Sequence, residues 1–351
     1  MLPAMIRVLV VDDSRTHRAA IAKIIERAPG FQLAGTAEDG EQGVEMVHKL
    51  KPDIVLMDVN MPKLDGMGAT ERIMAEKPTP ILLMTASENL TGEVDLAYKA
   101  IDHGALELIA KPRGLNSEDK DTQDLLQKLK LLAGVPVISH LRGRRPGGKD
   151  SRKRSSTSSI IRRARKIVAI GASTGGPRAL RTFLAGLPAD LGATVTIVQH
   201  IDGMFVDGLV RWLGEAGPIP VSVAEEGRSL HENEVLVAPA GRHMEIAADR
   251  RITLKEAKDG GAHCPSADHL LRSAAWTYGP RAIGVVLTGM GDDGARGLLS
   301  IREAGGVTFA QDEATSVVYG MPRAAKELGA ASFVLPIQQI AEAVARACRG
   351  V

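Results

Sequence analysis

The sequence predicts an α/β protein made of two doubly wound domains, and two observations carry this prediction. Short apolar segments alternate with amphipathic helical segments over residues 6–112, and the alternation resumes at residue 167. Strands that alternate with helices in this way form parallel sheets with helices on both faces. The length of 351 residues also exceeds what one hydrophobic core usually holds.

The first domain is expected at residues 1–125, with five strands and the helices between them. Its apolar runs suit strands that are buried on both faces, and Pro52 and Pro78 end two of its helices. The expected strands are Ile6–Val11, Gln32–Thr36, Ile54–Met57, Pro80–Thr85 and Ala105–Ala110. The expected helices are Arg15–Arg27, Gly43–Lys51, Gly66–Glu76 and, packed on this domain, Asp121–Ala133.

A basic segment then interrupts the alternation, and we expect a flexible linker at residues 134–164. Between Arg142 and Lys166 there are 11 Arg or Lys residues and a single acid, Asp150, among many Gly, Ser and Pro residues. Such a composition buries too little apolar surface to become ordered. We interpret the charge as that of a solvated linker. Contact with an acidic partner or with nucleic acid is the alternative.

The second domain is expected at residues 165–351 as a Rossmann-like fold. Its clearest strands are β-branched runs that end in turns with Gly or His, namely Ile167–Ile170, Thr194–Val198 and Ile283–Leu287. Helices are expected at Arg178–Ala185, Asp207–Trp212 and Ala295–Ala304. Residues 218–255 instead indicate an antiparallel excursion made of the short strands Val221–Ala224, Glu234–Ala238, Met244–Ala247 and Arg251–Lys255.

Composition and the N-terminus indicate a reduced, cytoplasmic protein. There are only two cysteines, Cys264 and Cys348, so a disulfide framework is not expected. No segment has the order of a signal peptide, and no apolar run reaches the length of a membrane helix, so no membrane insertion is expected. The net charge is only +2, which does not suit a general binder of nucleic acid.

Charged and hydroxyl side chains gather at the strand ends of the first domain. Asp12 and Asp13 follow the first strand, Asp58 follows the third, and Thr85 and Lys111 end the fourth and fifth. Carboxyl ends of parallel strands meet at one edge of a sheet, so these groups should converge. Clustered carboxylates suit Mg²⁺, while a hydroxyl and an ammonium beside them suit a bound phosphoryl group.

These residues resemble two-component receiver domains over about residues 1–115. The resemblance is carried by Asp12-Asp13-Ser14, Asp58–Gly66, Thr85-Ala86 and Lys111-Pro112. It implies that Asp58 accepts phosphate from a histidine kinase. It also implies Mg²⁺ as the receiver's cofactor, with the ligands Asp13, Asp58 and the Asn60 carbonyl. Asp12 would act through water, and Thr85 and Lys111 would sense the phosphoryl group.

One position departs from that pattern. Receivers often carry an aromatic switch residue three positions before the lysine, and this chain has Leu108 there. The usual aromatic signal is therefore not expected, although the phosphorylation site is.

Three strand ends of the second domain carry a possible catalytic set. Ser173 lies in the small-residue turn Gly171–Pro177 before a helix, and His200 ends the next strand. Asp292 and Asp293 stand among the glycines that follow Ile283–Leu287. Ser, His and Asp at three strand ends fit a nucleophile, its base and an orienting acid. Taken alone, the glycine-rich turn also suits a phosphate or dinucleotide site.

The second domain resembles the chemotaxis protein-glutamate methylesterases, the CheB family. The segments that carry the resemblance are Gly171–Pro177, Gln199-His200, Ala238-Pro239, His243-Met244, Pro265–Asp268, Leu287–Gly294, Ala310–Glu313 and Tyr319–Pro322. The resemblance implies hydrolysis of glutamyl methyl esters on chemoreceptors and deamidation of receptor glutamines. Ser173 would be the nucleophile, His200 the base, Asp293 the orienting acid and Met290 N–H an oxyanion donor, without a cofactor in this site.

Other interpretations use the same residues differently. Cys264 could act as a nucleophile, and His243, His263 and Cys264 could bind zinc, although no ligand spacing recurs. The chain could also be a non-enzymatic binding module, or a phosphorylation-regulated nucleic-acid binder that relies on the basic linker. The receptor, the pathway and the oligomeric state are not encoded in any motif.

Overall fold

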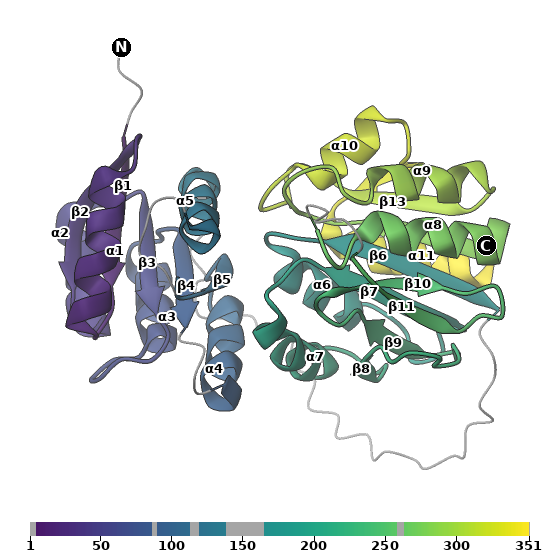
Figure 1. Ribbon diagram of the computed structural model, residues 1–351, viewed down its shortest axis with the longest axis horizontal. Helices are drawn as coiled ribbons and strands as arrows, with labels where there is room; N and C mark the ends of the chain where they lie inside the picture. Colours follow the sequence, from purple (N-terminus) through teal and green to yellow (C-terminus); the bar gives the residue numbers. More distant parts are fainter. Residues whose placement is uncertain (1–4, 86–89, 113–118, 138–164, 258–262, 351) are drawn as a thin grey trace.

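The structure, a computed structural model, describes residues 5–85, 90–112, 119–137, 165–257 and 263–350. These residues form two α/β domains, one at each side of Figure 1. Most of the expected linker at 134–164, from residue 138 onward, lies outside the described residues. No helix among the described residues combines the length and the apolar content needed to cross a membrane.

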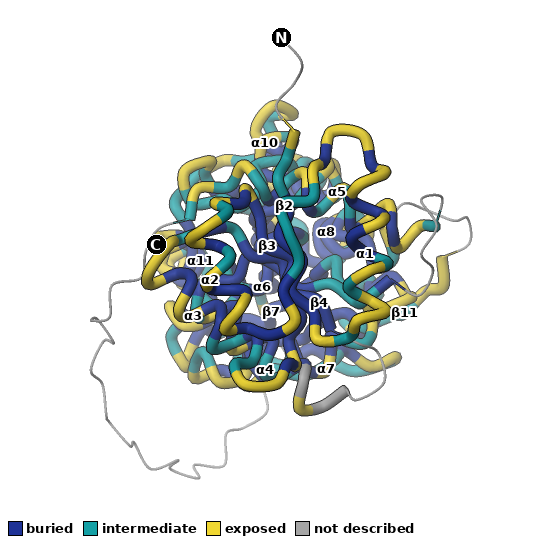
Figure 2. The backbone as a smooth tube through the Cα atoms, turned by 90° about the vertical axis from the view of Figure 1, so that its left-hand side faces the viewer, coloured by how far each residue is buried: buried dark blue, intermediate teal, exposed yellow. Residues whose placement is uncertain are grey.

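The first domain contains a five-stranded parallel sheet with the order β2-β1-β3-β4-β5. All five expected strands are confirmed, with bounds that differ by at most two residues. Figure 2 looks onto this domain from the side of β2, and the inner strands β3 and β4 are dark blue there, whereas the helices beside them carry exposed, yellow stretches. The strands are β1 (Ile6–Val11), β2 (Phe31–Ala37), β3 (Ile54–Asp58), β4 (Ile81–Thr85) and β5 (Glu107–Ala110).

Side-chain caps begin three helices of this domain. Ser14, Asp39 and Asp65 each accept a hydrogen bond from the backbone N–H three residues later, which satisfies a free donor of the first turn. Helix α4 was not predicted, although Val94, Ala97, Tyr98 and Ile101 form its buried stripe. The helices are α1 (Arg15–Arg27), α2 (Gly40–Leu50), α3 (Gly66–Glu76), α4 (Leu90–Asp102) and α5 (Lys120–Leu132).

The second domain contains a seven-stranded sheet with the order β14-β13-β12-β6-β7-β9-β8, in which every pairing is parallel. The Rossmann-like prediction is therefore confirmed, and the three predicted strands are the central ones. The strands are β6 (Lys166–Ala172), β7 (Ala193–Gln199), β8 (Val221–Val223), β9 (Glu234–Val237), β12 (Ala282–Val286), β13 (Val307–Gln311) and β14 (Phe333–Leu335).

The antiparallel excursion predicted for residues 218–255 is wrong for its first half. Strands β8 and β9 pair in parallel, and β9 also pairs in parallel with β7. All four residues of β9 are buried, as is typical inside a parallel sheet that is covered on both faces. The second half of the prediction is confirmed, because β10 (Arg242–Ile246) and β11 (Ile252–Glu256) form an antiparallel pair in a separate two-stranded sheet.

Helices cover both faces of the larger sheet. One hydrophobic cluster joins it to α6 (Gly176–Ala185), α7 (Val206–Gly214) and α11 (Ile337–Arg349). Another joins it to α8 (Ala267–Tyr278), α9 (Ala295–Glu303), α10 (Met321–Glu327) and the β10–β11 pair. Helices α8, α10 and α11 were not predicted. The three predicted helices are confirmed as α6, α7 and α9.

The two domains meet where α4 packs on α7. A Cβ atom added at Gly208 would lie 2.2 Å from Val94 Cγ1, so the helices approach closely at this glycine. Tyr98 is fully buried, donates a hydrogen bond of 3.1 Å to the Phe205 carbonyl and stacks on Trp212 with 5.2 Å between ring centroids. The carboxyl edge of the larger sheet therefore faces the first domain (Figure 1).

Candidate active site

Ser173 lies in a tight turn between β6 and α6. Its backbone N–H donates to the Thr288 carbonyl over 3.0 Å, and its own carbonyl accepts from Gly176 N over 2.7 Å. Gly175 has a φ of 76°, a conformation that favours glycine, and a Cβ there would lie 2.5 Å from Val317 Cβ. The turn holds the partly exposed Ser173 hydroxyl at the carboxyl edge of the sheet.

His200 follows β7, the neighbour of β6, and this pairing brings it beside the serine turn. His200 N donates to the Ala172 carbonyl over 3.0 Å. The buried Gln199 amide donates from Nε2 to the Ser173 carbonyl at 2.8 Å and to the His200 carbonyl at 3.0 Å. Gln199 was part of the family resemblance but had no predicted role, and these hydrogen bonds show that it ties the two turns together.

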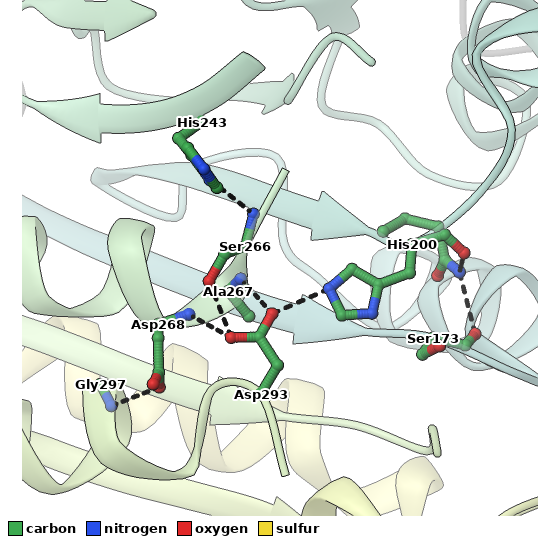
Figure 3. A network of polar contacts seen from close by, with 9 residues as sticks. Ser173, His200, His243, Ser266, Ala267, Asp268, Asp293 and Gly297 are labelled. Atoms are coloured by element: carbon green, nitrogen blue, oxygen red, sulfur yellow. Dashed lines mark hydrogen bonds and ion pairs between the residues drawn. The ribbon is translucent and has the colours of Figure 1, made fainter. Parts of the chain in front are cut away.

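Asp293 binds the imidazole of His200 and also the start of α8. His200 Nε2 is 2.8 Å from Asp293 Oδ2 (Figure 3). The carboxylate also accepts from Ser266 Oγ at 2.8 Å, Ala267 N at 2.7 Å and Asp268 N at 3.0 Å. Two of these donors are free N–H groups of the first turn of α8, where a negative charge is favoured.

These contacts control the charge of Asp293. Burial by itself would raise the pKa of this carboxyl group. The hydrogen bond and charge of His200, the Asp268 N–H and the Ser266 hydroxyl outweigh burial and hold the pKa of Asp293 well below its usual range. The group is therefore ionised at neutral pH and can orient a histidine and stabilise its protonated form.

The second nitrogen of His200 is left for another partner. His200 Nδ1 is buried, and no described residue forms a hydrogen bond with it. When neutral His200 donates Nε2–H to Asp293, Nδ1 carries the lone pair. Figure 3 shows the ring between Asp293 and the Ser173 turn, an arrangement suited to accepting a proton on the serine side.

The loop after β12 passes directly over the serine turn. A Cβ at Gly289 would lie 2.6 Å from Ser173 Cβ, so only glycine permits this approach. Gly320 N and Met321 N both donate to the Gly289 carbonyl, at 3.1 and 2.9 Å, and fix the loop from the other side. Met290, the predicted oxyanion donor, thereby lines the same cavity as Ser173 and His200.

This cavity, of about 520 Å³, lies between the two domains. The second domain contributes Ser173, His200, His263 and Met290 to its wall. The first domain contributes residues of β5 and α5 and the lysine after β5, among them Leu108, Lys111, Asp124, Gln127 and Lys128. Contact across it is direct, since Gln127 Nε2 is 3.4 Å from Met290 Sδ.

The first domain holds its acidic cluster at the expected edge of the sheet. Asp12, Asp13 and Asp58 each offer a carboxylate oxygen within 4.8 Å of the others, a spacing that fits a divalent cation. Lys111 Nζ lies 2.6 Å from Asp58 Oδ2 and 2.9 Å from Asp12 Oδ2. Burial raises the pKa of Asp58 to about 6, against the opposing effect of Lys111.

The other residues predicted to take part in phosphorylation lie at the same edge. Thr85 is the buried last residue of β4, and Asn60 lies two residues beyond β3. Leu108 is 2% exposed and packs in the core, at the position where receivers often carry an aromatic side chain. The Asn60 carbonyl as a metal ligand and the effect of Leu108 on switching stay predictions.

The alternative uses of His243, His263 and Cys264 find little support. His263 stacks on His200, with 4.3 Å between ring centroids, whereas His243 stacks on His269 and accepts a hydrogen bond from Ser266 N. In the described part of the chain, no metal-binding group contains them. Burial raises the pKa of the Cys264 thiol, which disfavours a thiolate nucleophile.

Comparison with known families gives two matches. The model of the CheB methylesterase family matches residues 168–344, and the model of the response regulator receiver domain matches residues 8–118. The methylesterase match covers both strands and the loop that carry Ser173, His200 and Asp293, and the receiver match covers Asp58.

Individual relatives are similar over nearly their whole length. A protein-glutamate methylesterase/protein-glutamine glutaminase of Anaeromyxobacter dehalogenans is 44% identical over 97% of this chain and 96% of its own. One of Myxococcus xanthus is 41% identical over 98% of this chain and 94% of its own. The crystal structure of the Thermotoga maritima CheB methylesterase catalytic domain matches with 35% identity and a TM-score of 0.50, over 52% of this chain and 97% of that one.

Proposed function

The chain belongs to the CheB methylesterase family, and on this premise we propose that it is a phosphorylation-activated protein-glutamate methylesterase and protein-glutamine glutaminase. Its substrates would be methyl-accepting chemoreceptors. During sensory adaptation it would hydrolyse their glutamyl methyl esters and deamidate selected glutamine side chains. Ser173, His200 and Asp293 form the proposed catalytic triad.

In the proposed reaction, Ser173 Oγ attacks the γ-carbonyl carbon while its proton moves to His200 Nδ1. Asp293 keeps the imidazole oriented through the 2.8 Å contact with Nε2. Met290 N–H stabilises the oxyanion that forms. His200 then protonates methanol or ammonia as it leaves the acyl-enzyme, and a water molecule, deprotonated by His200, hydrolyses that intermediate to glutamate and free Ser173.

The observation that carries this proposal is the set of hydrogen bonds that Asp293 accepts from the start of α8 while it contacts His200. An ionised carboxylate with three further donors can fix the tautomer of His200 without being protonated itself. The test is mass spectrometry of methylated receptor incubated with the phosphorylated protein. Loss of methyl groups is expected with the natural chain and not with Ser173→Ala. Unchanged methylation with both proteins, or equal activity of both, would refute the proposal.

We propose that the receiver controls this activity through phosphorylation of Asp58 by a histidine kinase. Asp13, Asp58 and the Asn60 carbonyl would hold Mg²⁺, whose positive charge would offset the repulsion between the Asp58 carboxylate and the incoming phosphoryl group, and Asp12 would act through water. The spacing of the three aspartates supports the cation. Thr85 and Lys111 would bind phosphoryl oxygens. The Lys111 ammonium already contacts the Asp58 carboxylate that would carry the phosphoryl group, which supports this role.

The proposed division is a receiver at residues 1–125, a linker at 134–164 and a catalytic domain at 165–351. The proposed kinase and receptor partners imply action in the cytoplasm, with no part for nucleic acid or for membrane insertion. The unphosphorylated receiver would cover the catalytic site. The contacts of α4 with α7, and of Gln127 with Met290, support this arrangement.

A further inference from the structure

A buried carboxylate of the receiver reaches into the catalytic domain. Glu107, the first residue of β5, is 2% exposed. Its Oε2 accepts a hydrogen bond of 2.9 Å from Gly175 N. Gly175 is the N-cap of α6 and lies two residues after Ser173. The acid therefore ends at the turn that carries the proposed nucleophile.

The buried position of Glu107 is unusual for a negatively charged side chain. A buried carboxylate is costly unless it is paired, and here the pairing is modest. Lys128 Nζ is 3.6 Å from the other carboxylate oxygen, and that lysine side chain is itself partly exposed. Further stabilisation comes from Gly175 N–H and from the N-terminus of α6, which favours a negative charge.

The same region should stabilise the reaction. During attack by Ser173 a negative charge develops on the substrate oxygen, next to the turn and the N-terminus of α6. A carboxylate already bound there takes up one backbone N–H and repels the second negative charge. At an effective dielectric constant of about 20, repulsion from a neighbouring unit charge changes a rate by on the order of tenfold or more.

Bulk alone does not close the site to small molecules. The cavity of about 520 Å³ beside Ser173 and His200 remains between the two domains. A water molecule takes up roughly 30 Å³ of liquid, so this space is large enough for a small ester. The receiver would exclude a receptor protein, whereas a short ester would still fit.

We propose that Glu107 inhibits the unphosphorylated enzyme by its charge, because its carboxylate occupies Gly175 N–H and opposes the oxyanion at Ser173. The inference rests on the proposed function and deepens its regulation. Two separate effects then restrain the enzyme. The receiver excludes the receptor by bulk, and Glu107 slows hydrolysis of any ester that reaches Ser173.

The experiment compares two substrates in the unphosphorylated full chain. The small substrate is an N-acetyl, C-amidated glutamate γ-methyl ester, whose hydrolysis is measured as methanol release. The large substrate is methylated receptor. Glu107→Gln keeps the shape and the acceptor but removes the charge, so kcat/KM for the small ester should rise about tenfold while receptor demethylation stays low. Asp95→Asn is the control, since it breaks an exposed interdomain ion pair of 2.9 Å with Arg211 away from the serine turn.

Each outcome is informative. No rise with Glu107→Gln, or an equal rise with Asp95→Asn, overturns the proposal. A parallel rise on both substrates means that the variant simply opens the domains, and that also overturns it. Circular dichroism and labelling of Asp58 by a small phosphodonor verify the fold of each variant. Failure of the phosphorylated natural chain to demethylate receptor would instead refute the proposed function, and is therefore distinguishable.

Discussion

At the scale of single residues, neighbouring acids in one loop have opposite environments. Asp293 accepts hydrogen bonds from His200, Ser266 and the first N–H groups of α8, whereas Asp292 is exposed. Sequence alone offered the pair, and the family pattern selected the second member. The geometry gives a physical reason for that choice, because only Asp293 reaches the imidazole.

The first prediction uses this pair. Asp293→Asn should lower kcat for receptor demethylation about a thousandfold or more, because the amide cannot hold His200 in the required tautomer or stabilise its protonated form. Asp292→Asn is the matched control and should keep kcat within about twofold. The measurement is methanol release by the phosphorylated enzyme. Similar losses in both variants would contradict the assignment of Asp293.

The second prediction concerns Asp58, whose pKa of about 6 lies above the unfolded value of 3.8. A raised acid pKa means that the folded state binds the proton more tightly. The stability that this provides is complete below pH 4 and is lost as pH rises through about 6. Asp58→Asn removes this loss, so at pH 7.5 without Mg²⁺ it should stabilise the chain by about 2–3 kcal/mol.

Urea unfolding at pH 4 and at pH 7.5 measures that difference, with EDTA present. The stabilisation by Asp58→Asn should be small at the lower pH and full at the higher one. Addition of Mg²⁺ should stabilise the natural chain more than the variant, because the variant lacks one proposed ligand. A gain that does not depend on pH would contradict the role of the buried carboxylate.

At the scale of elements, sequence patterns predicted what is local. The five strands of the first sheet came from apolar runs, and α1 and α3 were predicted with the observed bounds. Helix α8 was not predicted, although Leu270, Leu271, Ala274 and Tyr278 have the spacing of a buried helical stripe. The predicted antiparallel direction of β8 and β9 was wrong. Their direction depends on the pairing of β9 with β7, which lies about 40 residues earlier in the sequence and which no local pattern records.

In the proposed site, too, the residues set by local patterns were predicted and those set by long-range packing were not. Strand ends pointed to Ser173, His200 and Asp293, since parallel neighbours place their carboxyl ends at one edge. The supports of these residues could not be predicted. Ser266 meets Asp293 across 27 positions, and Glu107 meets Gly175 across 68. Such contacts depend on how α8 and β5 pack, which no local pattern records.

The third prediction concerns the α4–α7 contact. Gly208→Ala adds a Cβ that would lie 2.2 Å from Val94 Cγ1, so the helices must separate. Receptor demethylation without a phosphodonor should rise severalfold, because the receiver then covers the site less tightly. Gly214→Ala is the control, since it lies in the same helix with no atom within 4 Å of its added Cβ. Equal basal activity in both variants would contradict the covering role.

At the scale of the whole molecule, one interface serves two proposed functions. The acidic cluster around Asp58 and the turn around Ser173 both lie at carboxyl edges of parallel sheets, and Lys111 lines the cavity that contains Ser173. A change at the phosphoacceptor therefore has a short path to the contact between domains. The buried cluster that joins Val94 and Tyr98 to Leu209 and Trp212 would have to separate for a receptor protein to reach Ser173.

The stacking of Tyr98 on Trp212 also gives the chain an optical reporter of that separation. The chain has two tryptophans, and Trp276 is 87% exposed, so Trp276→Phe leaves Trp212 as the single indole emitter. Trp212 is 5% exposed and donates from Nε1 to Asp102 of the receiver at 3.1 Å. Beryllofluoride with Mg²⁺, which mimics the phosphorylated state, should shift its emission to longer wavelength. In the double variant Trp276→Phe, Asp58→Asn, the same addition should leave the emission spectrum unchanged.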